Sequence, residues 1–193
     1  MRIVAGAWRG RALIAPPGET IRPTADRVRQ ALFDMLVHAP WGGRETVEGA
    51  HVLDAFAGTG ALGLEALSRG AAHATFIERD RAAVAALRAN VAALHAEDRT
   101  RIIAGDALAP SRAASPCTLV FLDPPYGQGV LARALAALAA AGWIGADALV
   151  VAETARDDPS PAQSPLAERT HGAARLTIWR WAGGDCRAAD KTG

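Results

Sequence analysis

Short apolar segments alternate with longer alanine-rich segments through most of the chain from Ala50 onward. The alanine-rich segments have helical spacing, and we expect helices at Ala61–Arg69, Arg81–Leu94 and Val130–Ala141. The apolar segments have the length of buried strands, which predicts strands at His51–Leu53, Thr75–Ile77, Arg101–Ala104, Leu119–Leu122 and Leu149–Ala152. This alternation is typical of an α/β fold in which helices cover both faces of a mostly parallel sheet.

The two ends of the chain depart from this rhythm. Arg2 to Ala15 is interpreted as an extended hairpin, and a helix is expected from about Ala25 to His38. Near the other end, strands at Leu166–Thr170 and Arg175–Trp181 flank a turn at His171-Gly172. We therefore divide the chain into a basic hairpin and helix (residues 1–45), a Rossmann-like domain (residues 46–182) and a polar tail (residues 183–193).

Composition is that of a globular protein, but charge is unevenly distributed. The 193 residues are 50% hydrophobic and 21% charged, with a net charge of +1. The first 29 residues nevertheless hold six arginines against Glu19 and Asp26. A basic segment of this kind favours a polyanionic partner such as nucleic acid, although a solvated surface explains the charge equally well.

Other classes of protein are disfavoured by what the chain lacks. Cys117 and Cys186 are too few for a disulfide framework, and the histidines show no ligand spacing, so we expect no metal. No signal segment opens the chain, and the alanine-leucine stretch from Val130 to Ala141 is too short to span a bilayer. A cytoplasmic location is the resulting expectation.

A glycine-rich loop follows the first strand of the alternating region. Gly58 and Gly60 allow the backbone to approach a ligand closely, and the next helix offers free N–H groups. Acids follow three of the strands, where ligands of doubly wound sheets bind. A nucleoside-like cofactor would therefore be held by Asp54, Phe56, Gly58, Gly60, Glu78, Asp106 and Ala107.

The same loop also fits the dinucleotide fingerprint, with Glu78 at the ribose position, so a nicotinamide oxidoreductase is a competitor. Asp54 precedes the loop, where it suits a cationic amino acid group better than a pyrophosphate. This favours S-adenosylmethionine as the cofactor. A Walker-type phosphate loop is excluded, because the only lysine is Lys191.

A second motif, Asp123-Pro124-Pro125-Tyr126, follows the strand at Leu119–Leu122. An exocyclic base amine is a poor nucleophile, and acceptors that hold its hydrogens help it to attack a methyl group. The Asp123 carboxylate and the Pro124 carbonyl are suitable acceptors, Pro125 stiffens the turn, and Tyr126 can stack on an extruded base. The motif indicates amine methylation but leaves guanine N2, adenine N6, cytosine N4 and a glutamine amide open.

The arginine-rich start of the chain narrows the choice by resemblance. Residues 2–11, 16–18 and 22–33, with the Arg22-Pro23-Thr24-Ala25-Asp26-Arg27 block, resemble the RsmD-type 16S ribosomal RNA guanine-N2 methyltransferases, as do residues 56–70 and 123–126. The resemblance covers roughly Met1 to Trp181. It implies a seven-stranded Rossmann-like class I methyltransferase with an antiparallel last strand. It also implies methylation of one guanine of 16S rRNA, within an assembling small ribosomal subunit.

The basic segment supplies candidate RNA contacts. Arginines can contact phosphates and an indole can stack on a base, which assigns RNA binding to Trp8, Arg9, Arg11, Arg22, Arg27 and Arg29. Packing within the hairpin is an equally good interpretation of Trp8. A DNA adenine methyltransferase and a non-catalytic RNA-binding module are the alternative functions. We expect a monomer, because no apolar helix face is left over.

Overall fold

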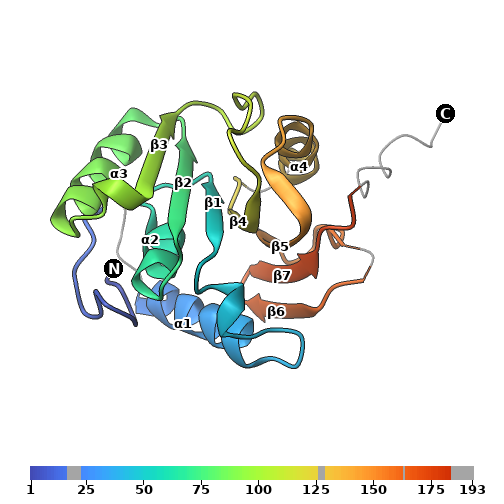
Figure 1. The fold of residues 1–193 in the computed structure, drawn as a ribbon. Helices are drawn as coiled ribbons and strands as arrows, with labels where there is room; N and C mark the ends of the chain where they lie inside the picture. The colour runs from blue at the N-terminus through green and yellow to red at the C-terminus, as the bar shows by residue number, and fades with distance from the viewer. Residues whose placement is uncertain (17–22, 126–128, 163, 184–193) are drawn as a thin grey trace.

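The computed structural model describes residues 1–16, 23–125, 129–162 and 164–183. Seven strands form one sheet in the order β3-β2-β1-β4-β5-β7-β6. Strands β1 to β5 are parallel neighbours, and β7 is antiparallel to both β5 and β6. The predicted mostly parallel sheet with an antiparallel last strand is confirmed (Figure 1).

The elements lie where the sequence pattern places them, although β5 extends well beyond the expected Leu149–Ala152. The strands are β1 (His51–Ala55), β2 (His73–Glu78), β3 (Thr100–Ala104), β4 (Cys117–Leu122), β5 (Ile144–Ala155), β6 (Ala167–His171) and β7 (Ala174–Arg180). The helices are α1 (Pro23–His38), α2 (Ala61–Ser68), α3 (Arg81–Ala93) and α4 (Val130–Ala140), with short 3-10 turns at Arg44–Thr46 and Glu97–Arg99. Helix α1 begins two residues earlier than expected, at Pro23, because proline fits the first helical position.

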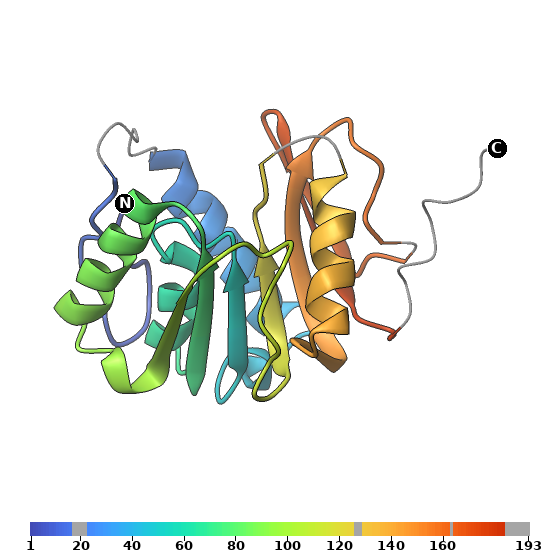
Figure 2. The same cartoon turned by 90° about the horizontal axis from the view of Figure 1, so that it is seen from above.

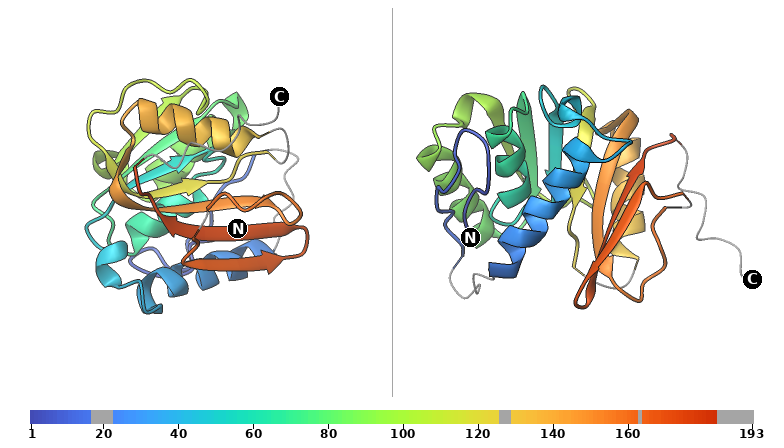
Figure 3. Two further views of the ribbon diagram at one scale, coloured as in Figure 1. Left: turned by 90° about the vertical axis from the view of Figure 1, so that its right-hand side faces the viewer. Right: turned by 90° about the horizontal axis from the view of Figure 1, so that it is seen from below.

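Helices cover both faces of the sheet. Helices α1, α2 and α3 pack on one face through apolar side chains such as Phe33, Leu64 and Leu87. Helix α4 covers the other face through Leu131, Leu135 and Leu138 (Figure 2). Figure 3 shows β5, β7 and β6 side by side at one end of the sheet. In the described part of the chain, no helix is long and apolar enough to cross a membrane.

The N-terminal arm, which we define as residues 1–16, folds back on itself as a hairpin, as its sequence predicts, although it forms no extended strands. An antiparallel bridge between Arg2 and Ala12 joins its two halves, and backbone hydrogen bonds on either side of that bridge support it. Between the two halves, the backbone N–H groups of Val4, Ala5 and Ala7 donate to side-chain and carbonyl oxygens of α2. The pairing of the two halves is therefore short, because α2 accepts the hydrogen bonds of the segment between them.

Candidate active site

The glycine loop and the Asp123 turn lie at the same rim of the sheet. The strand order reverses between the neighbours β1 and β4, which is where ligands of open α/β sheets bind. Two cavities of about 420 and 740 Å³ open at this rim, and both are lined by Phe56, Asp123 and Glu153. The two motifs are thus brought together around one continuous groove, of a size usual for small-ligand sites.

The loop after β1 is held by backbone geometry and by the buried carboxylate of Asp54. Phe56, Gly58 and Gly60 have φ values of 65°, 53° and 78°, in the left-handed region that favours glycine. Asp54 Oδ2 accepts a hydrogen bond from the Gly63 N–H at 2.9 Å, within the first turn of α2. These contacts fix the loop before any ligand binds.

Asp54 is the most perturbed acid of the site. Burial raises its pKa to about 8, the Gly63 N–H opposes this shift, and the nearby charges of Asp123 and Glu78 add to it. Burial destabilises the anionic form of this carboxyl. A cation bound beside it would lower the pKa again and form a favourable ion pair with the carboxylate. Asp54 is therefore suited to a positively charged ligand group.

The smaller cavity is lined by the acids that follow β2 and β3. Glu78 accepts hydrogen bonds from the N–H groups of Gly58 and Asp80, both at 2.8 Å. Asp106 Oδ1 accepts from the Leu108 N–H at 2.9 Å, and Ala107 is buried beside it. Each carboxylate has further lone pairs that can receive hydroxyl or amino groups, as ribose and adenine offer.

Asp123 stands directly after β4, between the two cavities. Burial among the groove residues and, second, the neighbouring Glu153 charge together raise the pKa of its carboxyl to about 7, although the residue is exposed at the mouth of the groove. Pro124 is buried and Pro125 is exposed. Tyr126 lies outside the described residues, so its stacking role stays a prediction.

The larger cavity extends from Asp123 to α1 and the turn between β6 and β7. Its walls carry mainly apolar side chains, and the carboxyl groups of Asp54, Asp123 and Glu153 line one end of it. The apolar part is formed by Val28, Leu32, Leu62, Val151 and Leu176. A planar apolar ring with a polar edge would match such a cavity.

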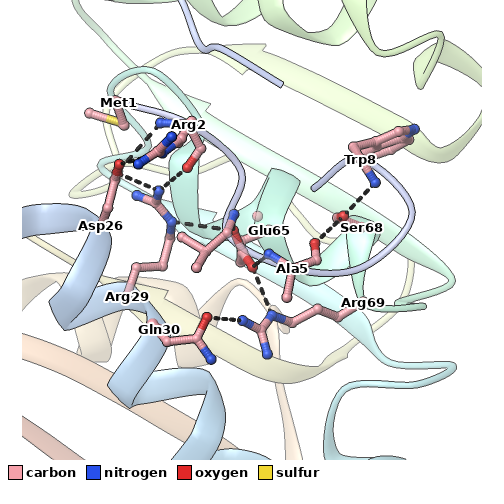
Figure 4. A network of polar contacts seen from close by, with 12 residues as sticks. Met1, Arg2, Ala5, Trp8, Asp26, Arg29, Gln30, Glu65, Ser68 and Arg69 are labelled. Atoms are coloured by element: carbon pink, nitrogen blue, oxygen red, sulfur yellow. Dashed lines mark hydrogen bonds and ion pairs between the residues drawn. The ribbon is translucent and has the colours of Figure 1, made fainter. Parts of the chain in front are cut away.

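The predicted RNA contact at Arg29 is wrong. Its side chain is 4% exposed and lies between α1 and α2 (Figure 4). Its Nη2 pairs with Asp26 Oδ1 at 2.8 Å and donates to the Arg2 carbonyl, while its Nε lies 3.4 Å from Glu65 Oε2. Ion pairing inside the protein leaves this guanidinium unable to reach a phosphate.

The N-terminal arm runs along α2 away from the groove. Met1 lines the larger cavity, whereas Trp8 lies at the far end of α2. There its backbone N–H donates to Ser68 Oγ, and the Arg99 guanidinium lies 5.1 Å from the centre of its ring. Arg9 and Arg11 are exposed near this far end. They are not among the residues that line the two cavities of the groove, and RNA contact by them stays a prediction.

The other two candidate RNA contacts are placed differently. Arg27 is exposed on α1, beside the larger cavity that Val28 lines. Arg22 lies outside the described residues, so its role also stays a prediction. In the described chain, no group of three or more His, Cys, Asp or Glu side chains is placed to hold a metal ion.

Comparison with known proteins identifies the family. The model of the family described as "Conserved hypothetical protein 95" matches residues 1–180. The ribosomal RNA small subunit methyltransferase D of Escherichia coli is 42% identical over 162 residues, which cover 83% of this chain and 78% of the relative. The chain belongs to the ribosomal RNA small subunit methyltransferase D family.

Further similarities agree with this membership. The methyltransferase D of Haemophilus influenzae is 36% identical over 187 residues, with 93% of both chains covered. A solved structure described as "Putative methyltransferase yhhF from Escherichia coli" superposes with a TM-score of 0.79 at 39% identity, and covers 95% of this chain and 98% of that one. The resemblance inferred from the sequence is therefore confirmed.

Two residues of the site were missed by sequence reasoning. Glu65 is an acid within the apolar face of a short helix, a signal that could have indicated a buried ionic contact. Glu153 follows an apolar segment of β5, much as Asp123 follows the apolar strand β4, but no motif surrounds it. Both residues follow apolar segments, as many acids outside functional sites do. Only their neighbours in three dimensions show that they belong to the site.

Proposed function

We propose that this member of the methyltransferase D family transfers the methyl group of S-adenosylmethionine to the N2 amine of a guanine in small-subunit ribosomal RNA. The observation that carries the proposal is the shared groove in which the glycine loop and Asp123 meet. Family membership supports ribosomal RNA as the substrate. A nicotinamide oxidoreductase is disfavoured, because hydride transfer gives the Asp123 motif no role.

The residues of the groove fit the cofactor. Glu78 would accept the ribose hydroxyls and Asp106 the adenine amino group in the smaller cavity, next to Phe56 and Ala107. Gly58 and Gly60 shape the loop above it, and Asp54 lies where a cationic amino acid group would be stabilised. When bound, the cofactor supplies an electrophilic methyl group.

The protein's own contribution is alignment and proton handling. The Asp123 carboxylate and the Pro124 carbonyl would accept the amine hydrogens and direct the nitrogen lone pair toward the methyl carbon. The nitrogen must lose one proton as it gains the methyl group. Asp123, with a pKa of about 7, is a competent acceptor for that proton.

The proposal includes the form of the substrate and of the enzyme. A monomer in the cytoplasm would act on an assembling small subunit, as the resemblance implies. Ile14 is the one large hydrophobic side chain that is exposed among the described residues, which supports a monomer. Sedimentation of the purified protein, and methylation rates on naked RNA and on small subunits, would test both statements.

One experiment tests the function. The protein is incubated with labelled S-adenosylmethionine and either naked ribosomal RNA, small subunits or duplex DNA, and the products are digested to nucleosides. Label in N2-methylguanosine from RNA is the expected result. Label in N6-methyladenosine from DNA would replace this proposal with a DNA adenine methyltransferase.

A further inference from the structure

We propose that Glu153 selects guanine at this site by accepting the N1–H of the base while Asp123 holds the neighbouring N2 amine. This inference rests on the proposed function and deepens it. The Asp123 motif alone fits several base amines, because every exocyclic amine offers hydrogens to a carboxylate. A second acceptor beside it would distinguish among the bases.

Glu153 is placed beside Asp123 by the register of the sheet. Leu122 of β4 pairs with Ala152 of β5, so the next residue of each strand is an acid. Side chains alternate along a strand, and Glu153 follows Val151 on the face that α1 covers. The Glu153 charge contributes to the raised pKa of Asp123, which shows that the two carboxyls are electrostatically close.

The surroundings of Glu153 favour a ligand that donates hydrogen bonds. Glu153 is half-buried and lines both cavities, so it faces the space between the cofactor residues and the apolar wall. Arg29, a cation that also lines the larger cavity, is engaged by Asp26 and Glu65. The part of the groove next to Asp123 thus presents acceptors from two adjacent strands.

Base edges differ in what flanks the amine. In guanine the N2 amine is adjacent to N1–H, so that edge offers donors side by side. In adenine and cytosine the amine is adjacent to a ring nitrogen that is an acceptor, which a carboxylate would repel. A site built to accept a hydrogen bond rejects an analogue that lacks the donor, because the buried acceptor is left unpaired.

The test uses a base that differs from guanine at the proposed contact. 2-Aminopurine carries the same 2-amino group, but its N1 is an unprotonated acceptor. The position that the wild-type enzyme methylates is first mapped on small-subunit RNA. Guanosine or 2-aminopurine riboside is then placed at that position, and single-turnover methylation rates are compared. The wild type should prefer guanosine by on the order of tenfold to a hundredfold, as expected when a hydrogen bond to a charged group is removed.

Glu153→Gln provides the decisive comparison. The glutamine amide can donate to the N1 of 2-aminopurine as well as accept from guanine, so the preference should fall toward unity. A purely structural role for Glu153 would slow both substrates equally and leave the ratio unchanged. The 2-aminopurine base also lacks O6, and comparing the ratio between the two enzymes removes that contribution. The matched control is Glu97→Gln, an exposed acid far from the groove.

The outcomes separate this inference from the proposed function. A ratio that falls in Glu153→Gln and is preserved in Glu97→Gln supports the assignment. Equal wild-type rates on the two bases, or an unchanged ratio in Glu153→Gln, would overturn it while guanine methylation itself stood. Methylation of adenine in place of guanine would overturn both.

Discussion

Arg29 and Glu65 form an ion pair inside the protein, with Nε and Oε2 3.4 Å apart and side-chain exposures of 4% and 0%. Glu65 also accepts from the N–H groups of Val4 and Ala5 and pairs with Arg69 Nε at 2.8 Å (Figure 4). One carboxylate therefore joins α1, α2 and the N-terminal arm. Because Met1 and Arg29 line the larger cavity, this contact also fixes one wall of the groove.

Glu65→Ala should lower the free energy of unfolding by on the order of 3–5 kcal/mol, because it leaves Arg29 and two backbone donors buried without their acceptor. Urea denaturation at neutral pH measures this change. The matched control is Glu48→Ala, which breaks an exposed pair with Arg44 (side-chain exposures 53% and 80%) and should cost at most about 1 kcal/mol. Equal costs for the two variants would show that the Glu65 contacts contribute no more than a surface pair.

Gly6→Ala should detach the N-terminal arm from α2. An added Cβ would stand 1.9 Å from the Ser68 carbonyl oxygen, whereas at Gly10 it would meet nothing within 4 Å. Both glycines have φ near +80°, so both alanine variants carry a similar backbone strain. Gly6→Ala should therefore be less stable than Gly10→Ala by about 1–3 kcal/mol. Urea denaturation and limited proteolysis of the arm measure the difference, and identical profiles would contradict the docking of the arm.

Asp54 should make the protein less stable as pH rises. Its pKa is raised from 3.8 to about 8 in the folded state, so between these values the folded protein holds a proton that the unfolded chain has released. The stabilisation is complete below the unfolded pKa and is lost as pH rises through the folded pKa, with a slope of up to about 1.4 kcal/mol per pH unit. Asp54→Asn should remove this component, which denaturation curves across that window would detect. A pH dependence identical to that of the wild type would show that Asp54 is ionised in the folded protein.

Sequence periodicity predicted the sheet and its helices because β1, β2, β4 and β5 consist mostly of buried apolar residues. The acids Asp54 and Asp123 could be placed at the rim for the same reason, since they end such strands. The docking of the arm on α2 could not be predicted in this way. Its hairpin was predicted, but its docking depends on backbone hydrogen bonds to Glu65 and Ser68, about sixty positions away in the sequence, and local sequence patterns do not reveal partners at that distance.

The burial of Arg29 could not be predicted from the charge composition either. The first 29 residues contain six arginines, and composition alone treats them as one basic surface. Whether a given arginine is exposed depends on its position on α1 relative to α2. Arg29 faces Glu65 and is buried, whereas Arg27, two residues earlier, is exposed. Residues that are close in sequence can lie on different faces of a helix, and a count of charges does not show this difference.

Methylation should accelerate as pH rises through about 7, because the Asp123 carboxyl, whose pKa burial and Glu153 raise to that value, must be ionised to accept the amine hydrogens. Single-turnover rates across the neutral range measure this. Asp123→Asn should lose the pH dependence and about a hundredfold or more in rate, with cofactor affinity nearly unchanged. Glu153→Gln should move the midpoint to lower pH, because it removes a neighbouring negative charge. A pH profile unchanged in Asp123→Asn, or loss of cofactor binding alone, would contradict the assigned role.

The salt dependence of RNA binding tests whether the N-terminal arm contacts phosphates. Arg9 and Arg11 are exposed at the end of the arm that lies away from the groove, so they can reach only RNA that extends beyond the methylated base. Replacing both with alanine should weaken binding and reduce the slope of log K against log salt by about 0.7–0.9 for each phosphate that the arginines no longer neutralise. Binding titrations at several salt concentrations measure the slope. Arg112→Ala, on an exposed loop beside α4 on the other face of the sheet, is the control and should keep the wild-type slope. If the double variant keeps that slope as well, the arm does not contact phosphate, and its arginines are ordinary solvated surface charges.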